Sequence, residues 1–185
     1  MHDDLSKEQK IKIEKFIDLA VEFNKTHNIF SRNKERDIYI KDILDCAPLT
    51  RHIKTNQTVL DLGSGGGFPG ILLAITRPNN KVCLVESSKK KCYFLKKTKE
   101  DLYLTNIKII NKTINKKNTF GVFDVITARA FANTKKILDI TKQNTHPKTK
   151  YLLLKGKKTT INKELKDIDN KRYKCEIIKQ DSKGF

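Results

Sequence analysis

The stretch TVLDLGSGGGFPGILLAI, residues 58–75, decides the fold of this chain. Residues 58–62 form a short apolar run typical of a buried strand, and residues 69–76 have the pattern of a helix. A glycine-rich loop joins the two, and glycine lets a backbone turn sharply and approach a ligand closely. This strand–loop–helix unit predicts the start of a parallel α/β sheet with a ligand site at the loop.

Two glycine patterns overlap in this loop, and they indicate different ligands. Gly65, Gly67 and Gly70 match the dinucleotide pattern G-x-G-x-x-G, whereas Asp61 and Gly63 open the pattern D-x-G-x-G-x-G. A dinucleotide loop places pyrophosphate on a helix N-terminus, and its first glycine normally follows the strand directly. Gly63 holds that position here, so the register favours the second pattern, which suits S-adenosylmethionine. Gly70 then falls inside the helix, where we expect it to serve close packing.

Acidic residues end the first two predicted strands. Asp61 can hold the ammonium group of S-adenosylmethionine through charge-assisted hydrogen bonds, directly or through water. Glu86 ends a second strand at residues 82–86 and can accept hydrogen bonds from both ribose hydroxyls of an adenosine. Because NAD sites use an acid at a similar spacing, an NAD-dependent oxidoreductase stays an alternative.

Strands and helices alternate through the remainder of the chain. Strands are predicted at residues 107–113, 123–131, 151–156 and 174–180, and helices at residues 88–104, 134–144 and 158–168. This alternation predicts an α/β fold with a doubly wound, mostly parallel, Rossmann-like sheet. Ligands of such sheets bind at the carboxyl ends of the strands, which is where the glycine loop lies.

Two further helices are predicted before the first strand, at residues 6–26 and 36–53. The second should carry its apolar side chains on one side, and Pro48 should end or kink it. Those side chains are Ile40, Ile43, Leu44 and Ala47. Since both helices precede the sheet, we expect residues 1–56 to form an N-terminal helical cap and residues 57–185 to form a single compact ligand-binding domain.

The chain is strongly basic. It has 39 Lys and Arg residues against 21 Asp and Glu residues, a formal charge of +18 over 185 residues. Such a field attracts polyanions, so nucleic acid or an anionic membrane surface is the natural partner class. Lys, Asn and Ile abound throughout, as they do when the base composition of a genome is biased, and composition therefore stays an alternative explanation of the charge.

The cysteines indicate a reducing compartment. Cys46, Cys83, Cys92 and Cys175 form no C-x-x-C pair, so we expect neither a zinc site nor a disulfide framework. The N-terminus has no apolar signal core, and no apolar run approaches the roughly 20 residues that span a bilayer. We therefore expect a soluble cytoplasmic protein without a membrane partner.

Four stretches carry a family resemblance: LDLGSGGGFPGILLAITRP, VESSKKKCYFLK, VFDVITARAFA and YLLLKG. Together they closely resemble the small-subunit ribosomal RNA guanine-N7 methyltransferase family, also called glucose-inhibited division protein B. The resemblance covers roughly residues 15–180, and Phe68-Pro69 joined to ARAFA is its most diagnostic part. It implies a class I methyltransferase fold, S-adenosylmethionine as cofactor, and ribosomal RNA or the small ribosomal subunit as partner. No oligomerisation motif is evident, which favours a monomer.

The resemblance also implies roles for individual residues. Gly63, Gly65 and Phe68 would line the donor site, Glu86 would meet the ribose, and Ile114 and Asn115 would lie beside the adenine. Arg129 would close the pocket, Lys155 would stand at the same rim, and Asn28 and Ser31 would shape the substrate side. Guanine N7 carries a lone pair and no proton, so no general base is needed. Arg129 and Lys155 would therefore act by positioning the substrate.

The chain also departs from the family. Asp42 stands where the family usually has His, and Asn115 stands where an acid is common. The usual final strand, a partner for residues 174–180, is expected to be missing. These departures leave open a second alternative, a non-enzymatic RNA-binding protein on a degenerate methyltransferase fold.

Overall fold

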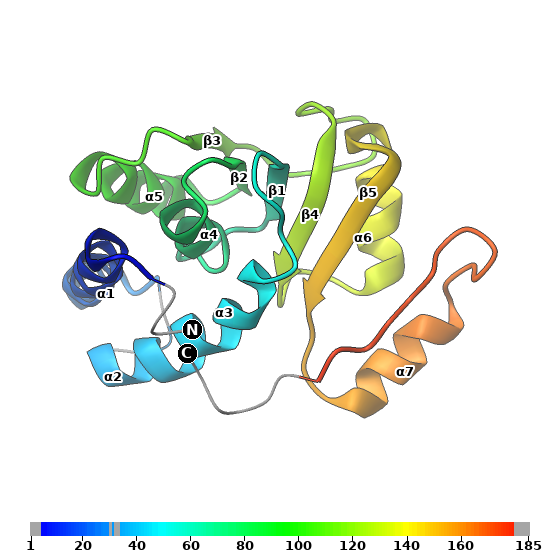
Figure 1. Cartoon of the computed structure of the whole chain (residues 1–185), viewed down its shortest axis with the longest axis horizontal. Helices are drawn as coiled ribbons and strands as arrows, with labels where there is room; N and C mark the ends of the chain where they lie inside the picture. Colours follow the sequence, from blue (N-terminus) through cyan, green and yellow to red (C-terminus); the bar gives the residue numbers. More distant parts are fainter. Residues whose placement is uncertain (1–4, 30, 32–33, 180–185) are drawn as a thin grey trace.

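The computed structural model describes residues 5–29, 31 and 34–179, and within them the strands form one parallel sheet (Figure 1). The strands are β1 (Thr58–Leu62), β2 (Lys81–Glu86), β3 (Ile107–Asn111), β4 (Phe123–Arg129) and β5 (Thr145–Leu154). Their order is β3-β2-β1-β4-β5, and every neighbouring pair is parallel. The predicted doubly wound parallel sheet is confirmed, with the carboxyl ends of its strands at one edge.

Helices cover both faces of this sheet. They are α1 (Lys7–His27), α2 (Glu35–Ile38), η2 (Tyr39–Ile43), α3 (Leu44–Thr50), α4 (Gly70–Thr76), α5 (Lys89–Asp101), α6 (Thr134–Ile140), η3 (Lys142–Asn144) and α7 (Lys158–Lys166). One apolar cluster joins α1, α4 and α5 to one face, and a second cluster joins α6 to the other. In Figure 1 the arrowheads of β4 and β5 point toward α3 and α7.

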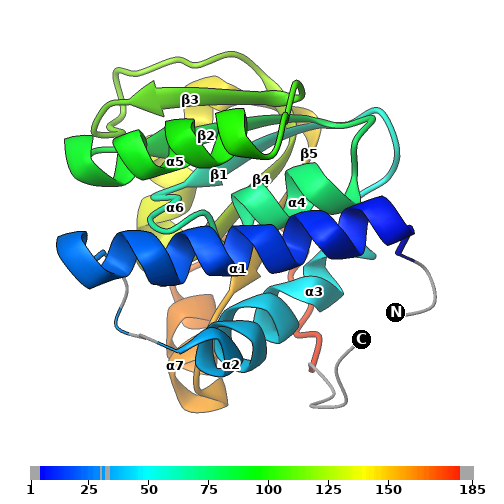
Figure 2. The same cartoon turned by 90° about the vertical axis from the view of Figure 1, so that its left-hand side faces the viewer.

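The N-terminal helix α1 lies across α4 and α5 (Figure 2). Ser6 caps it in a capping box with Gln9, as the S-x-x-Q spacing allows. Its apolar stripe is buried, and the ring of Phe16 lies with its centroid 4.8 Å from that of Phe68 in the glycine loop. The N-terminal helix therefore contributes to the same core as the sheet and also supports the loop after β1.

The helix predicted at residues 36–53 is wrong in detail. A π-helical turn, η2, interrupts it, and the backbone N–H of Leu44 donates to the carbonyl of Tyr39. Each π turn holds more residues than an α turn, which changes the angular positions of the residues within it. Ile40 is consequently 46% exposed instead of lying on the apolar side with Ile43, while Asp42 is fully buried.

The prediction of a strand at residues 174–180 is wrong for residues 174–179, which have no regular secondary structure, and Gln180 lies outside the described residues. Ile177 and Ile178 are exposed, and the segment pairs with no strand of the described sheet. An apolar β-like pattern becomes a strand only when another strand satisfies its backbone groups. Strand β5 is longer at its start than predicted, since it begins at Thr145 and not at the predicted Tyr151.

Helix α4 lies unusually close to the sheet at Gly70. A Cβ atom at this position would lie 2.2 Å from Leu84 Cδ2 on β2 and 2.6 Å from Asp61 Oδ2 on β1. Asp61 is itself fully buried, and its Oδ1 accepts a hydrogen bond of 2.9 Å from Thr127 Oγ1 on β4. The expected packing role of Gly70 is thereby confirmed, and it depends on contacts with two strands.

We predict that Gly70→Ala destabilises the fold by about 1–3 kcal/mol, because its methyl group must displace Leu84 or Asp61. The measurement is the free energy of unfolding in urea. Gly156→Ala is the matched control, since a Cβ there would meet nothing within 4 Å. Equal unfolding free energies for the two variants would contradict the packing role.

We also predict a pH-dependent effect of Asp61→Asn. Burial raises the pKa of Asp61 from 3.8 to about 6, although hydrogen bonds from Ser64 and Thr127 counteract it. Between about pH 4 and pH 6 the folded protein keeps a proton that the unfolded chain has lost, so the stability contributed at this position falls as pH rises. Above about pH 6 the buried carboxyl group is ionised, and this charge lowers the free energy of unfolding. Asp61→Asn removes the charge and therefore removes this destabilisation.

The stability of Asp61→Asn relative to the natural sequence should thus rise by roughly 2–3 kcal/mol between about pH 4 and pH 7. Urea denaturation at both pH values measures the difference. Asp18→Asn, on the exposed side of α1, makes the same charge change without a buried carboxyl group. A pH-independent difference for Asp61→Asn would show that its carboxyl group is not held in this buried state.

Candidate active site

The glycine loop, residues 63–69, connects β1 to α4 at the carboxyl edge of the sheet. Its backbone needs glycine, because φ is +62° at Gly63, +55° at Gly65 and +93° at Gly67. The N–H groups of Gly63 and Ser64 donate to the carbonyl of Val85 at 2.9 and 3.2 Å. The loop therefore bends over the end of β2, where Glu86 is located.

Glu86 accepts hydrogen bonds from the glycine loop and from the start of α5. Its Oε2 accepts a hydrogen bond of 2.9 Å from the N–H of Gly65, and its Oε1 accepts one of 2.7 Å from the N–H of Ser88, the N-cap of α5. Ser87 Oγ also donates to Oε1 at 3.4 Å, so of the about four acceptor positions of a carboxylate one remains for a further donor. Glu86 is therefore oriented by contacts within the protein and can still accept a hydrogen bond from a ligand hydroxyl group.

The loop suits a phosphate group poorly. The N–H groups of Gly63, Ser64, Gly65 and Gly67 already donate to Val85, Glu86 and Ser64 within the protein. Pyrophosphate needs free N–H groups at a helix N-terminus, and the Glu86 carboxylate beside Gly65 would repel it. The geometry thus argues against the dinucleotide alternative, in agreement with the register of the glycines.

Asp61 lies beneath the loop and has no exposed surface. Its carboxyl group faces Thr127 and Gly70, and its main-chain carbonyl accepts a hydrogen bond of 3.1 Å from Ser64 Oγ. This arrangement fixes the end of β1 under the glycine loop. The carboxyl group itself does not reach the surface of the loop in this structure.

Arg129 ends β4 and joins the sheet to the N-terminal helices. Its guanidinium group lies 2.6 Å from Asp42 Oδ1 and 3.6 Å from Asp45 Oδ2, and its central carbon is 5.4 Å from the ring centroid of Phe68. Phe68 is buried between this cation and Phe16 of α1. The predicted residues Phe68 and Arg129 are therefore brought together, and the Asp42 departure supplies the acid that pairs with Arg129.

Lys155 follows β5 and forms a second charged junction. Its Nζ lies 2.8 Å from Glu164 Oε2 on α7 and donates to the carbonyl of Ala132 at 2.7 Å. The same Glu164 oxygen accepts hydrogen bonds from the N–H and Oγ1 of Thr134 at 2.8 and 2.7 Å. Lys155 and Glu164 together hold the segment between β4 and α6 in place.

The remaining predicted residues lie farther apart. Ile114, after β3, is buried in the apolar cluster on the α6 side, and the neighbouring Asn115 is exposed in a turn where its Oδ1 accepts from the N–H of Lys117. Asn28 ends α1 in the left-handed conformation, with φ of 45°. Ser31 is exposed between α1 and α2. Lys90 of α5 donates to the carbonyl of His27, which places the end of α1 beside the start of α5.

One side chain at this edge was not predicted. Phe131 lies against Gly63, since a Cβ on that glycine would be 2.4 Å from Phe131 Cδ2. The sequence pattern placed Phe131 inside a strand, but β4 ends at Arg129 and Ala130 turns the chain with φ of 49°. The signal in the sequence was one aromatic residue among small ones, directly after the strand end.

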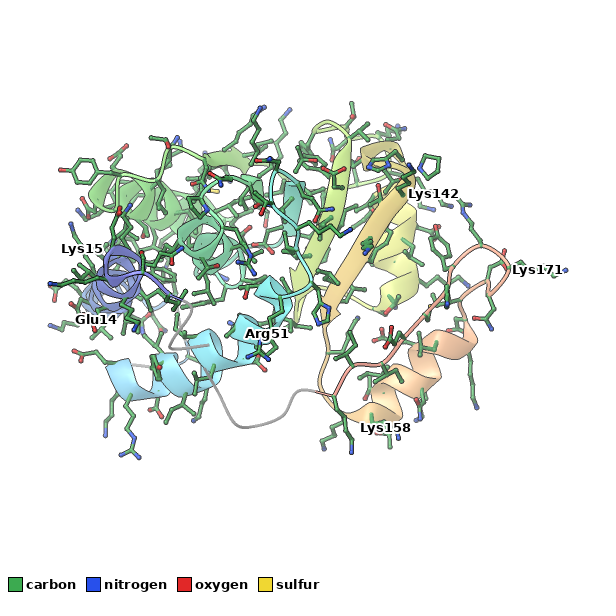
Figure 3. The ribbon with its side chains drawn as sticks, in the orientation of Figure 1. Glu14, Lys15, Arg51, Lys142, Lys158 and Lys171 are labelled. Atoms are coloured by element: carbon green, nitrogen blue, oxygen red, sulfur yellow. The ribbon has the colours of Figure 1, made fainter. Side chains whose placement is uncertain are left out.

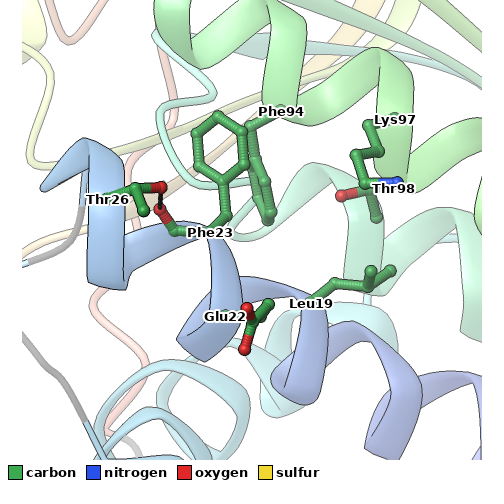
Figure 4. A pocket seen from close by; sticks show the side chains of 7 residues that line it. All are labelled: Leu19, Glu22, Phe23, Thr26, Phe94, Lys97 and Thr98. Carbon is green, nitrogen blue, oxygen red and sulfur yellow. Dashed lines mark hydrogen bonds between the residues drawn. The ribbon is translucent and has the colours of Figure 1, made fainter.

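Several other features lie outside this constellation. A pocket of about 160 Å³ between α1 and α5 is lined by Leu19, Phe23 and Phe94 among others and contains none of the predicted residues (Figure 4).

Burial raises the pKa of the Cys46, Cys83 and Cys92 thiols, which keeps them protonated. Among the described residues no group of His, Cys, Asp and Glu could hold a metal ion, and none of the helices found there could span a membrane.

Two solved methyltransferases have a similar fold. Coclaurine N-methyltransferase bound to N-methylheliamine and SAH superposes with a TM-score of 0.56 at 19% identity, over 75% of this chain and 42% of that chain. A SAM-dependent methyltransferase from Thiobacillus denitrificans in complex with S-adenosyl-L-homocysteine superposes with a TM-score of 0.51 at 18% identity, over 74% and 53% of the chains. These likenesses confirm the class I methyltransferase fold.

Sequence relatives identify the family. A ribosomal RNA small subunit methyltransferase G from Brachyspira hyodysenteriae is 35% identical over 97% of this chain and 88% of its own length. Another, from Rickettsia bellii, is 37% identical over 90% of this chain and 84% of its own length. The family described as rRNA small subunit methyltransferase G matches residues 9–183. With the glycine loop, Glu86 and the parallel sheet in place, this chain belongs to the rRNA small subunit methyltransferase G family.

Proposed function

We propose that this enzyme transfers a methyl group from S-adenosylmethionine to N7 of a guanine in small-subunit ribosomal RNA. One observation carries the donor assignment: the Glu86 carboxylate bridges Gly65 and Ser88 beside a glycine loop in which the N–H groups of residues 63, 64, 65 and 67 donate within the protein. Family membership supports the RNA substrate, and the resemblance of the quoted motifs supports guanine N7.

The donor site comprises residues from the carboxyl edge of the sheet. They are Asp61, Gly63, Gly65, Phe68, Glu86, Ile114, Asn115 and Arg129. Glu86 accepts hydrogen bonds from the ribose, and backbone groups of Ile114 and Asn115 lie beside the adenine. Asp61 acts from beneath, because its buried carboxyl group fixes Gly70 and Thr127 under the loop.

When bound, S-adenosylmethionine supplies a methyl carbon that its sulfonium group already activates. The protein needs no general base, because guanine N7 has no proton to lose. Its contribution is positioning, which is worth up to roughly 7–11 kcal/mol in well-oriented reactions. The two positive charges that we assign to substrate positioning, Arg129 and Lys155, both face acids in this structure. They therefore do not repel the cationic base that methylation produces.

Residues 1–56 form the substrate-side cap of this proposal, with Asn28 and Ser31 shaping the rim, and residues 57–185 form the donor-binding domain. Arg129 links the two through Asp42. We further propose that the enzyme works as a cytoplasmic monomer. Its basic side chains reach phosphates from the outside of the fold, where Lys158 and Lys171 point away from the ribbon (Figure 3).

Calorimetry with S-adenosylmethionine and with NADH tests the donor assignment. The natural sequence should bind S-adenosylmethionine and not NADH. Glu86→Gln should lose roughly 10- to 100-fold in donor affinity, since an amide cannot accept from both Gly65 and Ser88 and leaves one N–H unpaired. Glu100→Gln on the exposed side of α5 is the matched control and should bind as tightly as the natural sequence.

Transfer of a tritiated methyl group to small ribosomal subunits tests the substrate. Label should appear in RNA, as N7-methylguanine after digestion, and Glu86→Gln should reduce it in step with donor affinity. Binding of NADH in place of S-adenosylmethionine would instead establish the oxidoreductase alternative. RNA binding without donor binding would establish the non-enzymatic alternative, and label in protein but not in RNA would overturn the substrate assignment.

The charge of +18 predicts different salt responses for the two substrates. Each phosphate contact adds roughly −0.7 to −0.9 to the slope of log affinity against log salt. Affinity for the ribosomal RNA substrate should therefore fall steeply between about 50 and 200 mM salt, whereas donor affinity should change little. Filter binding and calorimetry at both salt concentrations measure this. Equal salt responses would show that the lysines do not contact phosphates.

A further inference from the structure

Phe131 is placed beside the glycine loop by an unusual backbone turn. Strand β4 ends at Arg129, and Ala130 then adopts φ of 49°, a left-handed conformation that L-residues with a side chain seldom take. This turn directs the ring of Phe131 onto the bare side of Gly63, where a Cβ atom would lie 2.4 Å from its Cδ2 and 3.0 Å from its Cε2. Only glycine at position 63 leaves room for this ring.

The segment that carries Phe131 is held from its other side. Lys155 Nζ donates to the carbonyl of Ala132, and Glu164 accepts from the N–H and Oγ1 of Thr134. Lys155 and Glu164 also pair with each other at 2.8 Å, with both side chains largely buried. The backbone that carries the ring of Phe131 is thus held by hydrogen bonds to Ala132 and Thr134.

Part of the ring remains free. Phe131 is 36% exposed although it packs against Gly63, and the Arg129 guanidinium nearby in the chain is occupied by Asp42 and Asp45. A half-exposed aromatic ring at the rim of a donor site, on a segment held by hydrogen bonds, has the form of a stacking platform for a planar group.

A stacking platform suits the proposed reaction. Guanine N7 becomes accessible to a donor in a protein pocket when the base leaves its stack in the RNA, and an aromatic side chain can restore the lost stacking. Stacking of one base on an aromatic side chain contributes roughly 5- to 150-fold in affinity. N7-methylguanine carries a positive charge, which the face of an aromatic ring attracts further.

We propose that Phe131 is the residue on which the target guanine stacks next to the methyl donor. This inference rests on the proposed function. It assigns a substrate contact to a side chain that lies against Gly63, apart from the ribose contact that we assign to Glu86. The role requires the π system of the ring, and a side chain of similar volume without one should not fulfil it.

Three variants test the proposal: Phe131→Tyr, Phe131→Leu and Phe131→Ala. Phe131→Tyr should keep kcat/KM for small ribosomal subunits within about two-fold, whereas Phe131→Leu and Phe131→Ala should lose roughly 5- to 150-fold. Calorimetric affinity for S-adenosylmethionine should stay within about two-fold in all three. Tyr103→Leu, an exposed aromatic residue at the turn after α5, is the matched control and should leave both quantities unchanged.

A second measurement does not depend on turnover. The fluorescence of 7-methylguanosine should be quenched by the natural sequence and by Phe131→Tyr, in the presence of S-adenosylhomocysteine, and not by Phe131→Leu. Equal quenching and equal kcat/KM for Phe131→Leu and the natural sequence would overturn the proposal. A loss of donor affinity equal to the loss of kcat/KM would also overturn it, because the ring would then belong to the donor site. Failure of the proposed function is distinct, since the natural sequence itself would not methylate RNA.

Discussion

The close approach of α4 to the sheet at Gly70 is the constraint on which the site depends. Because no Cβ separates them, Gly70 lies directly against Leu84 and the buried carboxyl group of Asp61. The chain must therefore travel from the end of β1 to the start of α4 within a few residues, which requires left-handed glycines at 63, 65 and 67. The compact loop that results brings the N–H of Gly65 onto Glu86, and the ligand edge takes its shape from this contact.

Charge is distributed differently at the site and over the rest of the surface. The chain as a whole is strongly cationic, yet Arg129 and Lys155 at the site pair with Asp42 and Glu164. An edge of the sheet with compensated charge suits a reaction whose product is a cation, because no unpaired positive group stands beside it. The external lysines are left to attract the phosphates of a polyanion. Under the proposed function, retention of RNA and accommodation of a charged base thus fall to different residues.

The parts of the fold that depend on local patterns could be predicted from the sequence. The apolar runs at residues 58–62 and 82–86 matched β1 and β2 closely, and the glycine register indicated the ligand loop. The π-helical turn at Tyr39–Ile43 and the exposed segment at residues 174–179 could not, because both depend on what surrounds them in space. The same holds for the pairing of Arg129 with Asp42, which are 87 positions apart, and for the contact of Phe131 with Gly63. Residue types and strand ends locate a site, but long-range contacts determine which side chain faces which.

The hydrogen bonds that Glu86 accepts from the N–H groups of Gly65 and Ser88 couple the stability of this protein to its ligand affinity. These two contacts order the loop and the first turn of α5 during folding, so little conformational entropy remains to be lost when a ligand enters. Ligand binding and folding are then linked equilibria, and a ligand that binds only the folded state raises the melting temperature by mass action. Changes remote from the ligand that loosen α4 or α5 weaken binding through this linkage. Natural variation in the packing of these helices can therefore tune the enzyme to its working temperature while the ligand contacts remain the same.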